Sequence, residues 1–201
     1  MLNASHVVSA ISLPNLKNLT SETPLPHLTS NPYSSVTVIN LVFPPTPRPI
    51  HPPGFGYLIP RPRNGYTPRT SGILGAVFDS CAMSQQDRGV PGFTRLTVML
   101  GGPYAPMLTP SHAKIENIMA QLQLHLAPNG PRLPWPVYYE AVEQRECIPT
   151  PTVGHVDRMA ELKQALKDGA WRGRLEVIGA GVGGVSVGDC IEAGRNVGKD
   201  W

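Results

Sequence analysis

A glycine-rich turn near the end of the chain carries the residue pattern with the clearest chemical meaning. It lies within LEVIGAGVGGVSVGDCIEAGR, residues 175–195, and its glycines are Gly179, Gly181, Gly183 and Gly184. An apolar strand pattern precedes the turn, and a short helical pattern begins near Gly188. Glycines let backbone approach a ligand closely, and a helix start presents unpaired N–H groups with a partial positive charge. We therefore expect an electron-rich group to bind at this turn.

The spacing of Gly179, Gly181 and Gly184 also satisfies the G-x-G-x-x-G dinucleotide fingerprint. That fingerprint needs a second strand after the helix and an acidic residue about 20 positions further on. The sequence stops at Trp201. A plain glycine-rich connection therefore explains the spacing better than an independent dinucleotide-binding unit.

Other residues that could carry chemistry are scattered. Three cysteines, Cys81, Cys147 and Cys190, lie far apart without C-x-x-C spacing, which predicts isolated thiols in a reducing compartment. The six histidines are also dispersed, so we expect no metal site. A formal net charge of +3 is too small to predict a nucleic-acid partner. The 201 residues, 41% apolar and 15% charged, suit a globular domain with a sizeable core.

Several segments resemble one enzyme family in the same order along the chain. GVSVGDCIEAGR resembles the carboxy-terminal flavin-contacting motif of protoporphyrinogen oxidases, usually close to GVAVNDCIESGR. The other matching segments are HVVSAISLP, GFGYLIP, GILGAVFDSCAM, RLTVMLGG and ECIP with VGH. The resemblance implies an FAD-dependent oxidase of haem synthesis, which converts protoporphyrinogen IX to protoporphyrin IX with oxygen as acceptor. The catalytic residues are not identified by these motifs.

The resemblance assigns a cofactor role to the last motif. It implies that the backbone of Val185, Ser186 and Val187 faces the flavin, and that the helix beginning near Gly188 points its positive end at the pyrimidine side of the ring. Gly188 replaces the usual asparagine, and we expect this change to remove a helix cap. Asp189 is expected to support the first helical turn rather than to act as a base.

The resemblance also implies that side chains of an expected sheet touch the tetrapyrrole. By motif, these are Phe55 and Leu58 of GFGYLIP, Val77 of GILGAVF and Met99 of LTVMLGG. Aromatic, branched and thioether side chains suit a large, flexible, hydrophobic macrocycle. Without the resemblance, all four residues would be interpreted as ordinary core, and this alternative stays open.

Strand patterns dominate the first two thirds of the chain. VTVINLVF, residues 36–43, predicts a strand buried on both faces or nearly so. Three shorter patterns separated by turn residues predict an antiparallel meander, at residues 57–60, 73–78 and 95–100. An amphipathic helix is expected to pack on this sheet, with Thr109 and Pro110 at its start and an apolar stripe at residues 115–126.

The two ends of the chain predict further elements. HVVSAISLP is interpreted as a buried strand, and the prolines within residues 14–35 exclude a long helix and predict a connection. Residues 137–144 and 175–178 predict strands. His155 opens a helical pattern that ends at Gly169. A structural role for His155 explains its position better than a catalytic one.

These patterns and the resemblance together predict an α+β fold. We expect an antiparallel substrate-binding sheet with a packed helix, and the C-terminal strand–helix edge of an FAD-binding α/β domain whose N-terminal Rossmann part is missing. The expected divisions are a returning segment of the FAD domain at residues 1–30, the substrate-binding sheet and helix at 31–147, and the end of the FAD domain at 148–201. Thr150 and Pro151 replace the family's usual Gln-Tyr, which puts any contact of those two side chains in doubt.

The expected partners and alternatives follow from the same reasoning. Partners are a porphyrinogen substrate, the missing N-terminal half of the enzyme, and a second copy in a homodimer. The resemblance implies the mitochondrial inner membrane, with membrane association only through the missing part, although the first 47 residues contain no arginine. The fragment alone is expected to be inactive, and a non-catalytic remnant or pairing subunit of a flavoprotein is the alternative. PPTPRPIHPP, residues 44–53, suits a rigid loop better than an SH3 ligand.

Overall fold

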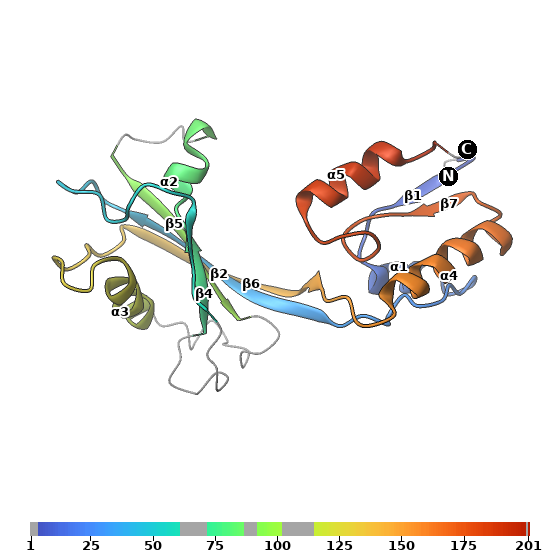
Figure 1. The fold of residues 1–201 in the computed structure, drawn as a ribbon, viewed down its shortest axis with the longest axis horizontal. Helices are drawn as coiled ribbons and strands as arrows, with labels where there is room; N and C mark the ends of the chain where they lie inside the picture. The colour runs from blue at the N-terminus through green and yellow to red at the C-terminus, as the bar shows by residue number, and fades with distance from the viewer. Residues whose placement is uncertain (1–3, 61–71, 87–91, 102–114, 200) are drawn as a thin grey trace. The chain divides into compact units, whose positions relative to one another are not determined.

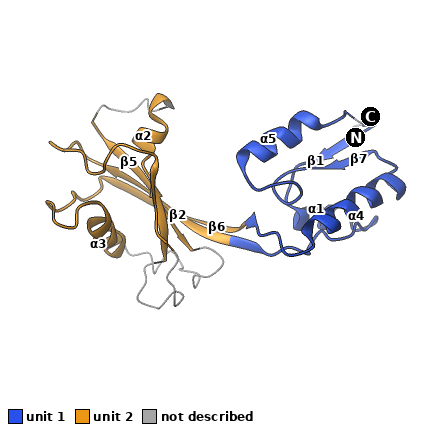
Figure 2. Ribbon diagram, in the orientation of Figure 1, with its two compact units in different colours: residues 1–34, 148–201 blue, residues 35–147 orange. Residues whose placement is uncertain are grey.

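The computed structural model of the chain describes residues 4–60, 72–86, 92–101, 115–199 and 201 (Figure 1). The chain forms two compact units. Unit 1 combines residues 1–34 with 148–201, and unit 2 comprises residues 35–147 (Figure 2). The assignment of a flavin role to one part of the chain and a substrate role to another stays a prediction.

Unit 2 is built on a five-stranded sheet with the strand order β3–β4–β5–β2–β6. The strands are β2 (Tyr33–Phe43), β3 (Gly56–Leu58), β4 (Ile73–Val77), β5 (Thr94–Gly101) and β6 (Tyr138–Pro149). β3, β4 and β5 pair antiparallel in succession, and β5 pairs antiparallel with β2. The predicted antiparallel meander is confirmed, because turn residues separate short strands that can pair with their neighbours in the sequence.

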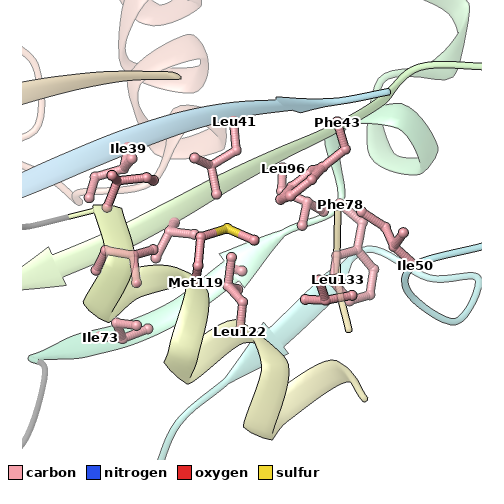
Figure 3. Packing of buried hydrophobic residues seen from close by; sticks show 14 of the residues in the cluster. Ile39, Leu41, Phe43, Ile50, Ile73, Phe78, Leu96, Met119, Leu122 and Leu133 are labelled. Atoms are coloured by element: carbon pink, nitrogen blue, oxygen red, sulfur yellow. The ribbon is translucent and has the colours of Figure 1, made fainter. Parts of the chain in front are cut away.

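One helix, α3 (Ile115–Leu126), covers one face of this sheet. Figure 3 shows Met119 and Leu122 of α3 packed among the core side chains of the strands. Ile118 and Leu122 are almost fully buried, and burial of such a side chain stabilises the fold by about 1.5–3 kcal/mol. The predicted apolar stripe is therefore confirmed, while its expected start at Thr109 and Pro110 lies outside the described residues.

β2 corrects the expectation of a strand buried on both faces. Ile39, Leu41 and Phe43 are at most 1% exposed, but the alternating residues Val38, Asn40 and Val42 are only partly buried. The apolar stripe of α3 packs on one side of the strand, so side chains that alternate to the other side keep some contact with solvent. The apolar composition of VTVINLVF concealed this alternation.

Two short helices lie where the sequence predicted loops. α1 (Leu13–Leu19) forms despite Pro14, since the first helical turn does not need the N–H that proline lacks. The prolines of residues 14–35 exclude a long helix but not this one. After β4 come α2 (Asp79–Ala82) and the 3₁₀ turn η1 (Ser84–Gln86), each separated by one residue from the element before it.

Unit 1 contains a parallel pair of short strands, β1 (Val7–Ser9) and β7 (Leu175–Val177). Figure 1 shows this pair between α5 (Val187–Asn196) and α4 (His155–Asp168). The core of unit 1 joins leucines of α1 to apolar residues of α4 and β7; its buried members are Leu13, Leu16, Leu28, Met159, Leu162, Leu166, Leu175 and Val177. The predicted helix at His155 and strand at Leu175 are confirmed.

β1 is less buried than the sequence predicted. Val7 and Val8 are exposed, and only Ser9 is buried. In the described part of the chain β1 pairs with β7 alone, so little apolar surface covers the two valines. None of the helices within the described ranges combines the length and apolar character that a membrane span requires.

Candidate functional site

The glycine turn between β7 and α5 is shaped by three different requirements for glycine. Gly179 adopts the left-handed backbone conformation, with φ of +108°. A Cβ on Gly181 would lie 3.1 Å from Leu13 Cγ, so the missing side chain lets the turn pack closely on α1. A Cβ on Gly184 would meet the carboxylate of Asp189. The glycines therefore let the turn pack against α1 and leave room for the Asp189 side chain at the start of α5.

Ser186 caps the N-terminus of α5, which corrects the expected place of the cap. The Asp189 N–H donates to Ser186 Oγ over 3.1 Å, and the Ser186 N–H donates to Asp189 Oδ2 over 3.0 Å. This reciprocal pair is a capping box. Gly188 lies inside the first turn rather than at the cap, so an asparagine there would not restore an N-cap. Ser186 could have been found from its spacing to Asp189.

Asp189 has the supporting role that the sequence predicted. Its carboxylate also accepts from the Ser186 hydroxyl over 2.6 Å. The side-chain hydrogen bond from Ser186, followed by the backbone one, holds the pKa of Asp189 below its usual value. An ionised carboxylate in the first turn stabilises the helix through the partial positive charge of the helix start.

Val185, Ser186 and Val187 present an accessible surface at this helix start. Val185 and Val187 are 51% and 77% exposed, and Ser186 is also exposed. N–H groups in the first turn of a helix have no carbonyl partner within the helix. Exposed apolar side chains beside such N–H groups can contact a planar, electron-rich group through its face and its edge.

Three of the four residues expected to touch a tetrapyrrole lie on one face of the sheet in unit 2. Leu58 is opposite Gly75, and Gly75 is opposite Met99. Val77 lies two residues along β4 from Gly75, so its side chain points to the same side. This face is opposite to the one that α3 covers, because the residues that alternate with Met99 along β5 are in the core.

Phe55 does not join this set. It precedes β3, and its carbonyl accepts from the Phe78 N–H over 2.9 Å. Phe55 is 74% exposed and Leu58 is 79% exposed, while Val77 and Met99 are partly exposed. The alternative that all four are core residues is therefore wrong.

A polar cluster that the sequence reasoning missed lies on the same face. The Thr97 hydroxyl is 2.7 Å from Asp79 Oδ2 and 3.1 Å from Asn40 Oδ1. Val77 of β4 is opposite Thr97 of β5, and Thr97 is opposite Asn40 of β2. Val77, Thr97 and Asn40 therefore lie side by side across three neighbouring strands. Single polar residues within VTVINLVF and LTVMLGG were the available signal, since a polar residue in an apolar strand marks a different environment.

The comparisons with known proteins are consistent with this arrangement. Residues 2–199 match the family of flavin containing amine oxidoreductases. The chain belongs to this family. It is 34% identical to the protoporphyrinogen oxidase of Homo sapiens over 199 residues, which are 96% of this chain and 39% of that protein. It is also 34% identical to the Schizosaccharomyces pombe protoporphyrinogen oxidase over 201 residues, 96% of this chain and 37% of that protein.

Two solved structures illustrate the similarity in fold. A protein from Exiguobacterium sp. 255-15 assigned as a protoporphyrinogen oxidase matches with a TM-score of 0.71 at 19% identity, over 96% of this chain and 40% of that one. Reduced UDP-galactopyranose mutase matches with a TM-score of 0.65 at 17% identity. The match covers 90% of this chain and 37% of the mutase chain. These likenesses concern the fold alone. The chain spans about 39% of its human relative and has a mixed sheet-and-helix architecture like the matched part of these proteins.

Family membership implies a flavin cofactor, and the start of α5 fits one side of such a group. A flavin ring is planar and has hydrogen-bond acceptors along its pyrimidine edge, and Val185 and Val187 offer it exposed apolar side chains beside a helix start. Gly183 adds to this access, because a Cβ there would meet no atom within 4 Å. Within the described ranges, no group of three or more His, Cys, Asp or Glu side chains could hold a metal ion.

A separate cleft of about 1020 Å³ lies in unit 1 beside α4 and β7. Its apolar lining includes Leu162, Leu166 and Leu175, and its charged lining includes Lys163 and Lys167. Val185, Ser186 and Val187 do not line it. The cleft is therefore a surface distinct from the helix start of α5.

Proposed function

We propose that this chain is part of an oxygen-dependent protoporphyrinogen oxidase that uses FAD to convert protoporphyrinogen IX to protoporphyrin IX in haem biosynthesis. The observation that carries the proposal is the 34% identity to the human protoporphyrinogen oxidase across 96% of this chain. Because the chain spans 39% of that relative, the activity is assigned to an assembly of this chain with a polypeptide equivalent to the remainder. A mitochondrial inner-membrane location and a homodimer belong to the same proposal.

In this proposal the open face of the unit 2 sheet forms one wall of the substrate site. Leu58, Val77 and Met99 contact the macrocycle through apolar atoms, while Asn40 and Thr97 supply the few polar groups that orient such a ligand. Phe55 lies before β3 and contacts the edge of the macrocycle in the same proposal. Burial of each apolar side chain against the ring stabilises the bound state by about 1–3 kcal/mol.

The start of α5 is assigned to the FAD ring. When bound, the flavin supplies the redox chemistry by accepting two electrons from the substrate in each step, and oxygen reoxidises it. The backbone of Val185, Ser186 and Val187 would contact the ring, and the start of α5 would lie toward its pyrimidine side. The helix start would favour the reduced, more negative ring, and the ionised carboxylate of Asp189 in the same turn would offset part of this effect.

The cleft beside β7 is assigned to the remainder of the enzyme. β1 and β7 form a parallel pair, and parallel sheets are usually buried by further strands and helices on both faces. The exposed lysines that line the cleft, Lys163 and Lys167, suit contact with a polypeptide surface that carries acidic side chains. Packing of that polypeptide in the cleft would complete the sheet of unit 1.

Co-expression with the unmatched portion of the human relative tests the proposal. The expected complex contains both polypeptides and about one FAD, measured from its visible absorbance after denaturation. Lys163→Glu combined with Lys167→Glu tests the cleft: it reverses two charges of the lining without changing α5, and it is expected to weaken assembly. Failure of the wild-type chain to bind the complementary polypeptide, or a complex without flavin, would overturn the proposal.

A further inference from the structure

His155, the first residue of α4, joins two segments that are distant in the sequence. Its Nε2 lies 3.0 Å from the carbonyl oxygen of Val182, and its Nδ1 lies 2.9 Å from Asn31 Nδ2. A carbonyl oxygen can only accept a hydrogen bond, so Nε2 must carry the proton. The neutral imidazole then has its lone pair at Nδ1, where it accepts from the amide of Asn31.

The orientation of Asn31 is fixed from its other side. Asn31 is 7% exposed, and its Oδ1 accepts from Arg158 Nη2 over 3.1 Å and from the Thr152 N–H over 3.3 Å. Because Oδ1 receives these donors, the amide nitrogen must point to His155. Hydrogen bonds arranged in a continuous series polarise and strengthen one another. The series runs from Arg158 through Asn31 and His155 to the carbonyl of Val182.

Val182 lies inside the glycine turn, where its side chain packs against the core of unit 1 and its carbonyl oxygen lies beside His155 Nε2. The Val182 N–H donates to the Gly179 carbonyl over 3.0 Å, which is a contact within the turn itself. Gly183 follows, and a side chain there would meet no neighbour within 4 Å. Glycine-rich backbone loses more conformational entropy on ordering than other sequences, so a bond from a rigid helix has a large effect on its position.

We infer that His155 is a positioning residue that holds the glycine turn, and through it the flavin-facing Val185 to Val187, in the geometry that binds the cofactor. The inference rests on the proposed function for its last step. The bond to Val182 acts only three residues before Val185, within the same turn. The hydrogen bond donated by Nε2–H holds the Val182 carbonyl. The hydrogen bond that Nδ1 accepts from Asn31 selects the tautomer in which Nε2 carries the proton.

Two uncharged variants separate these two bonds. In His155→Gln the side-chain amide can reach the position of Nε2 and donate to Val182. In His155→Asn the carbonyl oxygen lies near the position of Nδ1 and can accept from Asn31, but the side chain is too short to reach Val182. His155→Ala removes both hydrogen bonds, and its loss of flavin affinity is the reference with which the Gln and Asn variants are compared.

Flavin affinity of the assembled enzyme is the first readout, measured by fluorescence titration. We expect His155→Gln to remain within about 2-fold of wild type, and His155→Asn and His155→Ala to bind roughly 3- to 10-fold more weakly, the usual effect of one lost hydrogen bond. Equal losses in the Gln and Asn variants would overturn the inference, because a general structural role predicts no difference between them.

Hydrogen exchange at the amides of residues 180–185 in the chain by itself is the second readout. Faster exchange in the Asn and Ala variants, with near wild-type exchange in the Gln variant, would support the role of His155 in holding the turn. If this pattern appeared while no variant or wild type bound flavin, the proposed function would fail and the positioning of the turn would stand. Unchanged exchange in all three variants would overturn the inference even if flavin binds.

Discussion

Substitutions of Leu58 and Met99 test the proposal that the open face of the unit 2 sheet contacts the substrate. Both side chains point away from the α3 core, so each can be shortened with little loss of packing. In the assembled enzyme, Leu58→Ala or Met99→Ala is expected to weaken the binding of a tetrapyrrole or a diphenyl-ether inhibitor by about 1–3 kcal/mol. Inhibition titrations measure this effect, and flavin content should stay normal.

Leu96 is the matched control for these two substitutions. It lies on β5 near Met99 but points into the core and is fully buried. Leu96→Ala is expected to lower the free energy of unfolding by about 2–5 kcal/mol, because it leaves a cavity. Loss of flavin from the Met99 and Leu58 variants equal to the loss of ligand binding would show that those residues support the fold instead.

Ser186 tests the capping box at the start of α5. Ser186→Ala removes the acceptor for the Asp189 N–H and is expected to destabilise unit 1 by about 0.5–2 kcal/mol, as measured by urea denaturation. Gly188→Asn serves as the comparison. Since Gly188 lies inside the helix, its substitution should change stability by less than about 1 kcal/mol. A larger effect at Gly188 than at Ser186 would contradict the assigned cap.

At the scale of elements, α3 and β3 are joined by a hydrogen bond that responds to pH. Tyr57 OH and His125 Nδ1 are 3.0 Å apart, and burial raises the pKa of Tyr57 to about 12, so the hydroxyl remains the donor. Burial lowers the pKa of His125 below its usual 6.5. The unfolded chain therefore takes up a proton at this position at a higher pH than the folded chain does.

The stability of unit 2 is accordingly expected to decrease as the pH falls from about 6.5 through the lowered pKa of folded His125. Above that window His125 is neutral in both states and has no effect on the pH dependence. Thermal unfolding measured between pH 7.5 and 5 checks this prediction. His125→Gln should lose part of the pH dependence, and an identical dependence in the variant would rule out His125 as its source.

The sequence predicted elements well where local pattern and final environment agree. β4, β5 and the apolar stripe of α3 follow from β-branched residues and from helical spacing. α1 was missed because prolines were treated as breakers throughout residues 14–35, although the first turn of a helix accepts them. The burial of β2 was overestimated because a largely apolar strand can still expose one face.

The candidate site was only partly within reach of sequence reasoning. Motif positions led to Leu58, Val77 and Met99, and strand register puts these residues on one face. Polar residues within apolar strands could have marked Asn40 and Thr97 individually, but their meeting with Asp79 depends on register between residues as far as 57 positions apart. The contacts of His155 with Asn31 and Val182 likewise depend on tertiary packing across 124 and 27 positions.

At the scale of the whole molecule, the chain by itself is expected to bind FAD weakly or not at all. The helix start of α5 offers contacts to one side of the ring, and the chain spans about 39% of its human relative, so contacts to the rest of the cofactor are assigned to the remainder of the enzyme. Equilibrium dialysis of the purified chain with FAD checks this prediction. Purification of the chain with stoichiometric yellow flavin would contradict it.

The oxidation of protoporphyrinogen IX by the assembled, flavin-loaded protein is the most direct test of the proposal that this chain is part of a protoporphyrinogen oxidase. The measurement is the rate at which porphyrin fluorescence appears in the presence of oxygen. We predict that fluorescence appears when this chain and the complementary polypeptide are combined, and that the rate is negligible with either one omitted. A complex that contains flavin but forms no porphyrin would contradict the assignment and identify the chain as a non-catalytic pairing subunit.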